Sequence, residues 1–336
     1  MEIPRFRRAL LKWFGSAKRP LPWRRTRDAY AIWVSEMMLQ QTTVAAVIPY
    51  FERFMARFPT FAALAASEED AVLSLWSGLG YYSRARNLRI GARTVVEFHR
   101  GAFPRDVATA LTLKGVGPYT ARAVTSMAYG TRAAVVDGNV RRVLSRLFAE
   151  RLMTKTRAQA HAEEVLAPQS PGSWNEAIME LGATICTPRN PRCLICPVSS
   201  DCEGRDRPEY WSEGKPRKAT VATFVAMTLF ERKGRILLRR NPVGGLMGGL
   251  LELPHSGLPG TQSAPPGFDG KTGGEPILKF RHTITHHRIE VSLYRATLKR
   301  NAPSTVGSPY RVEDLPSLPL GGLTRKALRS LKLMAS

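Results

Sequence analysis

The chain has 336 residues, of which 43% are hydrophobic and 23% are charged, as in ordinary globular proteins. At roughly 100–200 residues per domain, this length predicts two or three domains, each able to bury a core without disulfides. Lys and Arg number 50 against 27 Asp and Glu, which gives a formal net charge of +23. This excess favours an acidic partner, either nucleic acid or an anionic membrane.

No apolar stretch reaches the roughly 18 residues that a membrane-spanning helix requires. The N-terminal residues are basic but lack the apolar segment of a secretory signal. The composition therefore argues against a secreted, membrane or disordered protein, and nucleic acid becomes the expected partner. We expect an intracellular, cytoplasmic protein.

Residues 1–205 are predicted to be almost entirely helical. Apolar residues recur at helical spacing in residues 29–57, 61–77, 86–100, 119–129 and 139–149, with polar residues, Gly or Pro between these segments. A polar segment with two prolines, residues 206–219, predicts a linker between domains.

Residues 220–336 are predicted to form an α+β domain. Residues 221–230 and 235–240 have strand composition and are joined by the turn sequence ERKG. A Gly-rich segment (244–249), a stretch without predicted structure (256–276), a second strand pair (279–298) and a helix near 322–334 follow.

The sequence LKGVGPYTA (113–121) predicts a tight turn that opens a helix. Gly115 and Gly117 permit the turn, and Pro118 suits the first helical position. Backbone N–H groups at such a helix start can bind a phosphate, which the basic charge favours. A plain helix–loop–helix turn is the alternative.

Two carboxylates are candidates for acid–base chemistry. Glu36 lies among apolar residues one helical turn away, which would raise its pKa and keep it protonated, as a general acid requires. A surface position on an amphipathic helix is its alternative. Asp137 ends an apolar run before a basic helix, so it is either an N-cap or a carboxylate presented to bound DNA.

The four cysteines of the chain all lie within residues 186–202, in the pattern Cys-x6-Cys-x2-Cys-x5-Cys (Cys186, Cys193, Cys196 and Cys202). Such clustering is typical of a metal site and not of a disulfide scaffold. Four thiolates suit either Zn²⁺ or an iron–sulfur cluster, and the spacing alone leaves both open.

Taken together, these motifs resemble the adenine DNA glycosylases of the MutY family, within the helix–hairpin–helix glycosylases. The resemblance rests on LPW (21–23), SEMMLQQT (35–42), GLGYYSRARNL (78–88), GVGPYTA (115–121), VDGNVRRVLSR (136–146) and the cysteine pattern. It implies an all-α helix–hairpin–helix domain over residues 1–205, a [4Fe–4S] cluster on the four cysteines, and a C-terminal Nudix-like domain over residues 220–336. It also implies excision of adenine opposite 8-oxoguanine or guanine in double-stranded DNA, by a monomer associated with the nucleoid.

The resemblance also implies roles for particular residues. Glu36 would protonate the adenine at N7 and Asp137 would stabilise the cationic sugar, supported by Tyr119 and Asn139. Binding of the adenine or the DNA is implied for Arg24, Gln41, Thr42, Tyr81, Gly115, Val116, Gly117 and Glu180. Gln41 and Tyr81 would form a wedge in the base stack, although Tyr81 alone also fits a core tyrosine.

Three further implications concern reaction type and lesion recognition. The related endonuclease III family has a Schiff-base lysine where this chain has Tyr119, so we expect excision without efficient strand cleavage. No REx-x-EE run follows GGLLELP (248–254), so hydrolysis of nucleoside triphosphates is not expected. Ile284, Thr285 and His286 match the family's loop for 8-oxoguanine, with an ordinary strand as the alternative. A bifunctional lyase and a non-enzymatic DNA-binding protein remain the competing functions.

Overall fold

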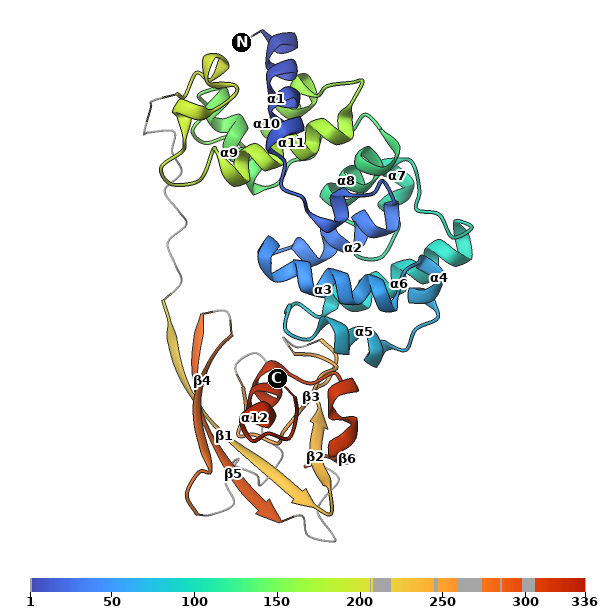
Figure 1. Ribbon diagram of the computed structural model, residues 1–336, viewed down its shortest axis with the longest axis vertical. Helices are drawn as coiled ribbons and strands as arrows, with labels where there is room; N and C mark the ends of the chain where they lie inside the picture. Colours follow the sequence, from blue (N-terminus) through green and yellow to red (C-terminus); the bar gives the residue numbers. More distant parts are fainter. Residues whose placement is uncertain are drawn as a thin grey trace. The chain divides into compact units, whose positions relative to one another are not determined.

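The computed structural model describes residues 2–205, 207, 219–244, 247–258, 274–284, 286–297 and 306–335. Nearly all of the predicted linker, residues 206–219, and much of the stretch 256–276 lie outside these ranges. The described chain divides into two compact units (Figure 1). The first contains residues 1–65 and 90–216, and the second contains residues 66–89 and 217–336.

Residues 1–205 are helical, as predicted. The helices are α1 (Ile3–Ala17), η1 (Pro22–Arg24), α2 (Ala29–Leu39), α3 (Val44–Arg57), α4 (Phe61–Ala65), α5 (Glu69–Trp76), α6 (Ser83–Phe98), α7 (Val107–Ala110), α8 (Pro118–Tyr129), α9 (Gly138–Leu147), α10 (Lys155–Val165), α11 (Pro171–Thr184), η2 (Cys193–Ile195) and η3 (Ser199–Asp201). None of the helices within the described residues is long and apolar enough to cross a membrane.

Two of the predicted helical segments were wrong in length, because each contains two helices. Residues 29–57 divide between α2 and α3 at Gln41, whose backbone adopts the left-handed conformation with φ of 58°. Residues 61–77 divide between α4 and α5 at Ser67 and Glu68, with Glu68 in extended conformation as the N-cap of α5. Hydrophobic periodicity continues through both breaks, so it could not locate them.

Helix α2 is buried on every side and forms the centre of the first unit. Residues Ala29 to Met38 are all buried, and the Asp28 side chain caps the helix by accepting hydrogen bonds from the backbone N–H groups of Tyr30 and Ala31. A helix that is apolar all round is typical of the interior of a larger domain. Helices α8 and α3 pack against it, so every side chain of α2 faces protein or an internal cavity.

The second unit is built on a mixed sheet in the order β3–β2–β1–β5–β4, with β6 paired to β2. The strands are β1 (Val221–Arg232), β2 (Arg235–Arg240), β3 (Leu251–Glu252), β4 (Leu278–Ile284), β5 (His287–Thr297) and β6 (Ser308–Arg311), followed by η5 (Val312–Ser317) and α12 (Gly322–Ser330). Strands β1 and β5 are parallel, whereas β4 and β5 are antiparallel. The predicted α+β class is therefore confirmed.

One face of this sheet packs against α12 (Figure 1). Alternate residues of β1 and β5, such as Met227 and Leu293, are fully buried on that face together with Leu323 and Leu328 of α12. Because strand side chains alternate between faces, this register directs the intervening residues, such as the exposed Phe224, to the other face. The strand composition of residues 221–230 and 235–240, joined by a turn sequence, was therefore sufficient to predict β1 and β2.

Candidate active site

The first unit contains a cavity of about 590 Å³ whose walls come from η1, α2, α8, α9 and α11. It is lined by Arg19, Leu21, Trp23, Arg24, Ile32, Ser35, Glu36, Leu39, Gln40, Gln41, Thr42, Val44, Tyr119, Met127, Val136, Asp137, Asn139, Glu176, Met179, Glu180 and Ala183. All four predicted catalytic residues are in this set. Segments that lie far apart in the sequence thus converge on one space.

Glu36 lies on α2 and is only 6% exposed. Burial raises the pKa of its carboxyl to about 7, because the charged form loses its hydration; the nearby carboxylates of Asp137 and Glu176 act in the same direction. The Tyr119 hydroxyl and Arg24 oppose this rise without cancelling it. The carboxyl can therefore donate a proton near neutral pH, and the alternative of a surface glutamate was wrong.

Asp137 is the N-cap of α9 and also lines the cavity. Its Oδ1 accepts a hydrogen bond from the Val140 backbone N–H at 2.7 Å, and its Oδ2 accepts one from Asn139 Nδ2 at 3.1 Å. Burial raises the pKa of Asp137, while these hydrogen bonds act to lower it. The N-cap interpretation of the sequence is therefore confirmed, and the same carboxylate lines the cavity; its presentation to bound DNA stays a prediction.

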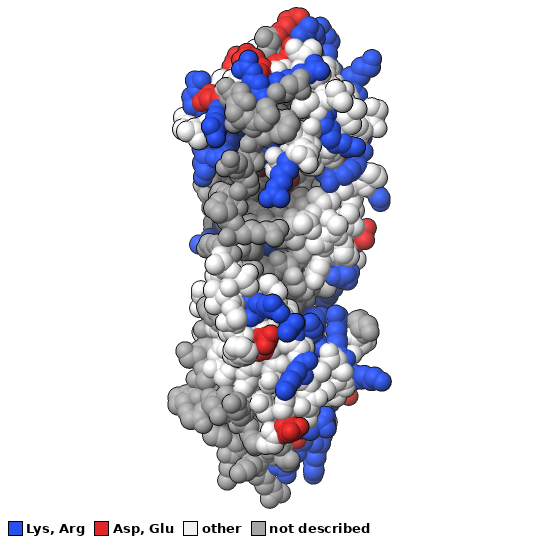
Figure 2. Space-filling view, turned by 90° about the vertical axis from the view of Figure 1, so that its left-hand side faces the viewer, with Lys and Arg blue, Asp and Glu red and all other residues white. Residues whose placement is uncertain are grey.

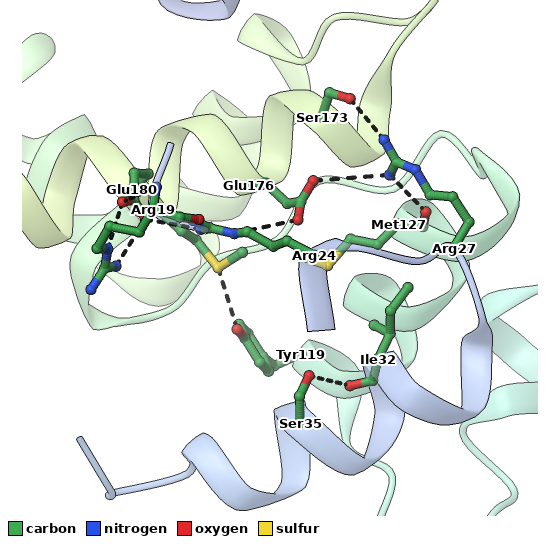
Figure 3. Close-up of polar contacts among 11 residues, drawn as sticks. Arg19, Arg24, Arg27, Ile32, Ser35, Tyr119, Met127, Ser173, Glu176 and Glu180 are labelled. Atoms are coloured by element: carbon green, nitrogen blue, oxygen red, sulfur yellow. Dashed lines mark hydrogen bonds and ion pairs between the residues drawn. The ribbon is translucent and has the colours of Figure 1, made fainter. Parts of the chain in front are cut away.

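An arginine–glutamate network closes another wall of the cavity (Figure 3). Glu180 is fully buried and accepts hydrogen bonds from Arg19 Nε at 2.6 Å and from Arg24 Nη2 at 2.9 Å. Burial acts to raise the pKa of Glu180, but the two guanidinium groups outweigh it, so the pKa is lowered. Arg24 Nε also lies 3.5 Å from Glu176 Oε1. Glu180 is thus held ionised beside the cavity, whereas burial raises the pKa of Glu176.

Tyr119 extends from α8 toward α11 (Figure 3). Its hydroxyl lies 3.4 Å from the Met179 sulfur. Burial raises the pKa of the phenol well above its ordinary value, with Glu36 adding to the effect. Tyr119 therefore stays neutral and can only donate or accept hydrogen bonds at the cavity wall.

Arg142 connects the cavity wall with the cysteine segment. One guanidinium nitrogen, Nη2, donates to Asn139 Oδ1 and to the Gly182 carbonyl oxygen, each at 2.7 Å. Its Nε donates to the Cys186 carbonyl oxygen at 2.8 Å. Asn139 in turn donates to Asp137, so a continuous hydrogen-bonded path runs from Asp137 to Cys186.

The four cysteines line a second, small cavity of about 30 Å³ within residues 186–202 and their neighbours. None of them forms a disulfide, and Arg146 Nη1 donates to the Cys186 sulfur at 3.2 Å. Among the described residues, no three His, Cys, Asp or Glu side chains converge as the ligands of a single metal ion do. A cubane cluster instead binds each thiolate through a different iron atom, and four cysteines around one small space fit it.

The predicted turn at residues 113–117 is present. Gly115 adopts φ of 83°, which favours glycine, and Gly117 is the N-cap of α8, with Pro118 as the first helical residue. The backbone N–H groups at the start of α8 are thus arranged as a phosphate site requires. Val116 is buried and anchors the turn, while Gln41 and Thr42 lie at the cavity.

The remaining predicted residues lie in the second unit and line no part of the cavity. Tyr81 is 42% exposed and adopts φ of 48°, so the alternative of a core tyrosine was wrong. Ile284 and His287 form the last pair of the β4–β5 ladder, and the His286 ring lies 4.3 Å from that of His287. Thr285 lies outside the described residues.

The sequence reasoning missed Arg19, Glu176 and Met179. Glu176, Met179, Glu180 and Ala183 follow the spacing i, i+3, i+4, i+7, so they share one face of α11, and that face lines the cavity. The spacing was visible in the sequence, but it resembles an ordinary amphipathic stripe. Arg19 gave no signal, since it precedes η1 in an irregular segment.

Comparison with known proteins accounts for most of the chain. Residues 34–168 match the model of the HhH-GPD superfamily of base excision DNA repair proteins. Residues 186–202 match the iron–sulfur binding domain of endonuclease III, and residues 225–330 match the NUDIX domain. The sequence left zinc and an iron–sulfur cluster open; the match to residues 186–202 identifies the cysteine segment as a [4Fe–4S] site.

Curated relatives and solved structures agree with these matches. The human adenine DNA glycosylase is 47% identical over 222 residues, which cover 62% of this chain and 41% of the relative. The Arabidopsis thaliana adenine DNA glycosylase is 38% identical over 300 residues, which cover 75% of this chain and 48% of the relative. The structure of a thermostable thymine-DNA glycosylase aligns with a TM-score of 0.57 and 30% identity over 61% of this chain and 97% of that one. A DNA-bound endonuclease III structure, at 23% identity, shares the fold.

The chain therefore belongs to the HhH-GPD superfamily of base excision DNA repair proteins. Within that superfamily it is similar to the human and Arabidopsis thaliana adenine DNA glycosylases, and its residues 225–330 match the NUDIX domain. The chain spans between 41% and 60% of the length of the curated relatives that it matches.

Proposed function

We propose that the chain is a monofunctional adenine DNA glycosylase that removes adenine mispaired with 8-oxoguanine and, less efficiently, with guanine. The observation that carries this proposal is Glu36, a buried carboxyl with a pKa of about 7, facing the same cavity as Asp137. Excision needs one group that donates a proton near neutral pH and another that stabilises positive charge. The cavity of about 590 Å³ has room for a nucleoside.

The reaction begins with extrusion of the adenine, since a base within the duplex cannot be reached. Glu36 donates a proton to N7 of the adenine, which makes the base a better leaving group as the N-glycosidic bond breaks. The sugar then carries oxocarbenium character, and Asp137 stabilises it electrostatically or by a transient bond, as the carboxylates of glycosidases do. Glu36, now ionised, assists the water that attacks the sugar carbon.

The other cavity residues orient these groups. Asn139 donates to Asp137 Oδ2 and so fixes that carboxylate beside the sugar. Tyr119 stays neutral and provides a hydroxyl near the acid, without the amine that a Schiff-base lyase needs. Arg24 and the ionised Glu180 form a polar wall that can hydrogen-bond to the edge of the flipped adenine.

DNA binding is assigned to three features. The turn Gly115–Val116–Gly117 holds a phosphate at the start of α8. Gln41, with Thr42 beside it, and Tyr81 enter the base stack near the lesion, where an aromatic ring gains about 1–3 kcal/mol by stacking. On the face of the molecule shown in Figure 2, Lys and Arg side chains are many and Asp and Glu side chains are few, as a phosphate backbone requires.

The C-terminal part is assigned to recognition of the base opposite the adenine. We assign the contact to Thr285 and His286; the latter lies at the end of the β4–β5 hairpin, where a histidine can hydrogen-bond to the oxidised base. The matches to family models end at residue 202 and resume at residue 225, which supports domains at 1–205 and 220–336 joined by a linker at 206–219. We further propose that the protein acts as a monomer associated with the nucleoid.

The [4Fe–4S] cluster is assigned a structural part in DNA binding. When bound to the thiolates of Cys186, Cys193, Cys196 and Cys202, it cross-links residues 186–202. Arg142 and Arg146 hydrogen-bond to this segment and tie it to α9. Loss of the cross-link would therefore loosen the contacts that hold Asn139 and, through it, Asp137.

A single gel assay tests the proposed function. The substrate is a duplex with adenine opposite 8-oxoguanine, analysed with and without hot alkali, and Glu52→Gln serves as an exposed control for Glu36→Gln. We expect strand breaks only after alkali for the wild type and the control, and none for Glu36→Gln. Breaks without alkali would support the lyase, and duplex binding without any excision would support a non-enzymatic DNA-binding protein.

A further inference from the structure

Residues 66–89 pack with the C-terminal part of the chain, although they belong to the helical sequence. The Arg240 guanidinium at the end of β2 pairs with the Asp70 carboxylate of α5 through two parallel hydrogen bonds of 2.8 and 2.7 Å. Arg86 Nη1 of α6 donates to the Gly248 carbonyl oxygen at 2.7 Å. The buried Ser77 hydroxyl donates to the Leu320 carbonyl oxygen. These contacts belong to one compact unit.

The packing is close enough to require glycine at position 249. Gly249 adopts φ of 81°, and an added Cβ would lie 3.1 Å from Arg86 Nη1 and 3.3 Å from Leu73 Cδ1. Its carbonyl oxygen accepts a further hydrogen bond from Arg240 Nη1 at 2.8 Å. Side chains of α5 and α6 and the backbone of residues 247–250 therefore fit together specifically, unlike a loose surface contact.

The same two helices hold the Tyr81 loop, residues 78–82. Trp76 Nε1 donates to the Gly80 carbonyl oxygen at 3.2 Å, and Arg84 Nη2 donates to the same oxygen at 3.1 Å. The Arg84 guanidinium also lies over the rings of Trp76 and Tyr81, at 5.4 and 5.6 Å from their centroids. The left-handed conformation of Tyr81 is unfavourable for an aromatic residue, so it persists only if these surroundings are held in place.

We propose that the C-terminal part positions Tyr81 for insertion into DNA, and that Asp70, Ser77 and Arg86 are positioning residues for the reading of the base opposite the adenine. The inference rests on the proposed function, because it takes Tyr81 as the wedge. It assigns the C-terminal part a second task besides direct contact through the β4–β5 hairpin. Lesion preference then depends on Arg240 and residues 247–250, which are not expected to touch the lesion themselves.

A charge-reversal series at the Asp70–Arg240 pair tests the proposal in the full-length protein. Asp70→Arg and Arg240→Asp each replace an attractive pair by a repulsive one, and the double variant restores the opposite charges. Arg311→Glu, Glu313→Arg and their double variant form the control, since that pair is exposed, 2.8 Å apart, and lies in the same unit without touching residues 66–89. Arg240→Lys is a milder variant that keeps the charge and loses the parallel hydrogen bonds.

Two readouts separate positioning from general stability. The first is the fluorescence of a 2-aminopurine placed beside 8-oxoguanine, which reports insertion of a wedge into the stack. The second is the ratio of excision rates opposite 8-oxoguanine and opposite guanine. We expect each single reversal to lower the ratio about fivefold and to reduce the fluorescence change, with at least half of both losses recovered in the double variant. The control series should change neither.

A third measurement does not depend on the proposed function. Hydrogen exchange of peptides covering residues 78–89 in the free protein should accelerate in each single reversal and slow again in the double variant. If exchange follows this pattern but the wild type excises no adenine, the proposed function fails while the coupling stands. Two results would overturn the coupling between the C-terminal part and Tyr81. One is that the single variants leave both the hydrogen exchange of residues 78–89 and the ratio of excision rates unchanged. The other is that the double variant recovers neither quantity relative to the single variants.

Discussion

Replacement of Glu36 by glutamine should abolish excision and at the same time stabilise the protein at alkaline pH. Glutamine keeps the shape and polarity of the side chain but cannot donate a proton. General acid–base catalysis contributes typically about 10²–10⁴-fold, so single-turnover excision should fall by at least about 100-fold. Duplex binding should stay within about threefold of the wild type, since the substituted glutamine keeps the van der Waals contacts of the cavity.

The gain in stability follows from the pKa of the buried carboxyl. Burial raises the pKa of Glu36 from an ordinary value of 4.5 to about 7. The folded state therefore binds a proton more tightly than the unfolded state, so this group's contribution to stability is complete below pH 4.5 and is lost as the pH rises through 7. At about 1.4 kcal/mol per pH unit, the difference corresponds to about 3 kcal/mol. Glutamine does not ionise, so the Glu36→Gln variant does not lose this part of its free energy of unfolding as the pH rises.

Urea unfolding of both proteins at pH 5 and pH 8.5 measures the effect, and the difference between variant and wild type cancels the titrating groups that do not interact with Glu36. We expect the variant to gain about 2.5 kcal/mol relative to the wild type over this range, because part of the total is already lost at pH 5. Wild-type excision should also fall about tenfold per pH unit above 7, as the acid form of Glu36 disappears. An unchanged stability difference, or single-turnover excision by Glu36→Gln within threefold of the wild type, would refute the assignment.

Three other variants test the rest of the site. Arg142→Gln removes the hydrogen bonds to Asn139, Gly182 and Cys186, so single-turnover excision should fall at least tenfold with iron content preserved. Excision by this variant at the wild-type rate would show that the hydrogen-bonded path from Asp137 to Cys186 does not support catalysis. The wild type should be brown, and Cys193→Ser should lose its visible absorbance and give less soluble protein; a colourless, active wild type with stoichiometric zinc would exclude the cluster. Residues 1–219 alone should excise adenine but lose most of the preference for 8-oxoguanine over guanine, measured as the ratio of excision rates; an unchanged ratio would place lesion recognition within those residues.

Much of the fold could be predicted from local pattern. The strand β1 has strand composition, with a run of five buried residues from Val225 to Leu229, and Gly115, Gly117 and Pro118 mark a turn and a helix start whatever the rest of the chain does. The packing of residues 66–89 with the C-terminal part could not be predicted in this way. It depends on pairs such as Asp70 with Arg240, which lie 170 positions apart, and neither member carries a local signal of its partner.

The residues of the site likewise fall into those that local sequence pattern identifies and those that only the fold brings together. Glu36 was a candidate because its apolar neighbours lie one turn away on the same helix, and that local environment proved to be its actual one. Arg19 and Glu176 could not be identified, since an arginine in an irregular segment and a glutamate on an amphipathic helix are both ordinary surface residues. Only the fold brings Arg19 to within 2.6 Å of Glu180 and turns the face of α11 that bears Glu176 toward the cavity.

In the proposed mechanism Asp137 serves both as a capping residue and as a catalytic group. The cap requires one carboxylate oxygen to accept from the Val140 N–H, which fixes the carboxyl group at the helix start and leaves Oδ2 to accept from Asn139 at the cavity. The positive end of the α9 dipole favours the ionised form of this carboxylate, against the burial that raises its pKa. The same bonds limit its side-chain motion, so little conformational entropy is lost when it meets a developing cation. The capping role and the proposed catalytic role of Asp137 are therefore two consequences of one geometry.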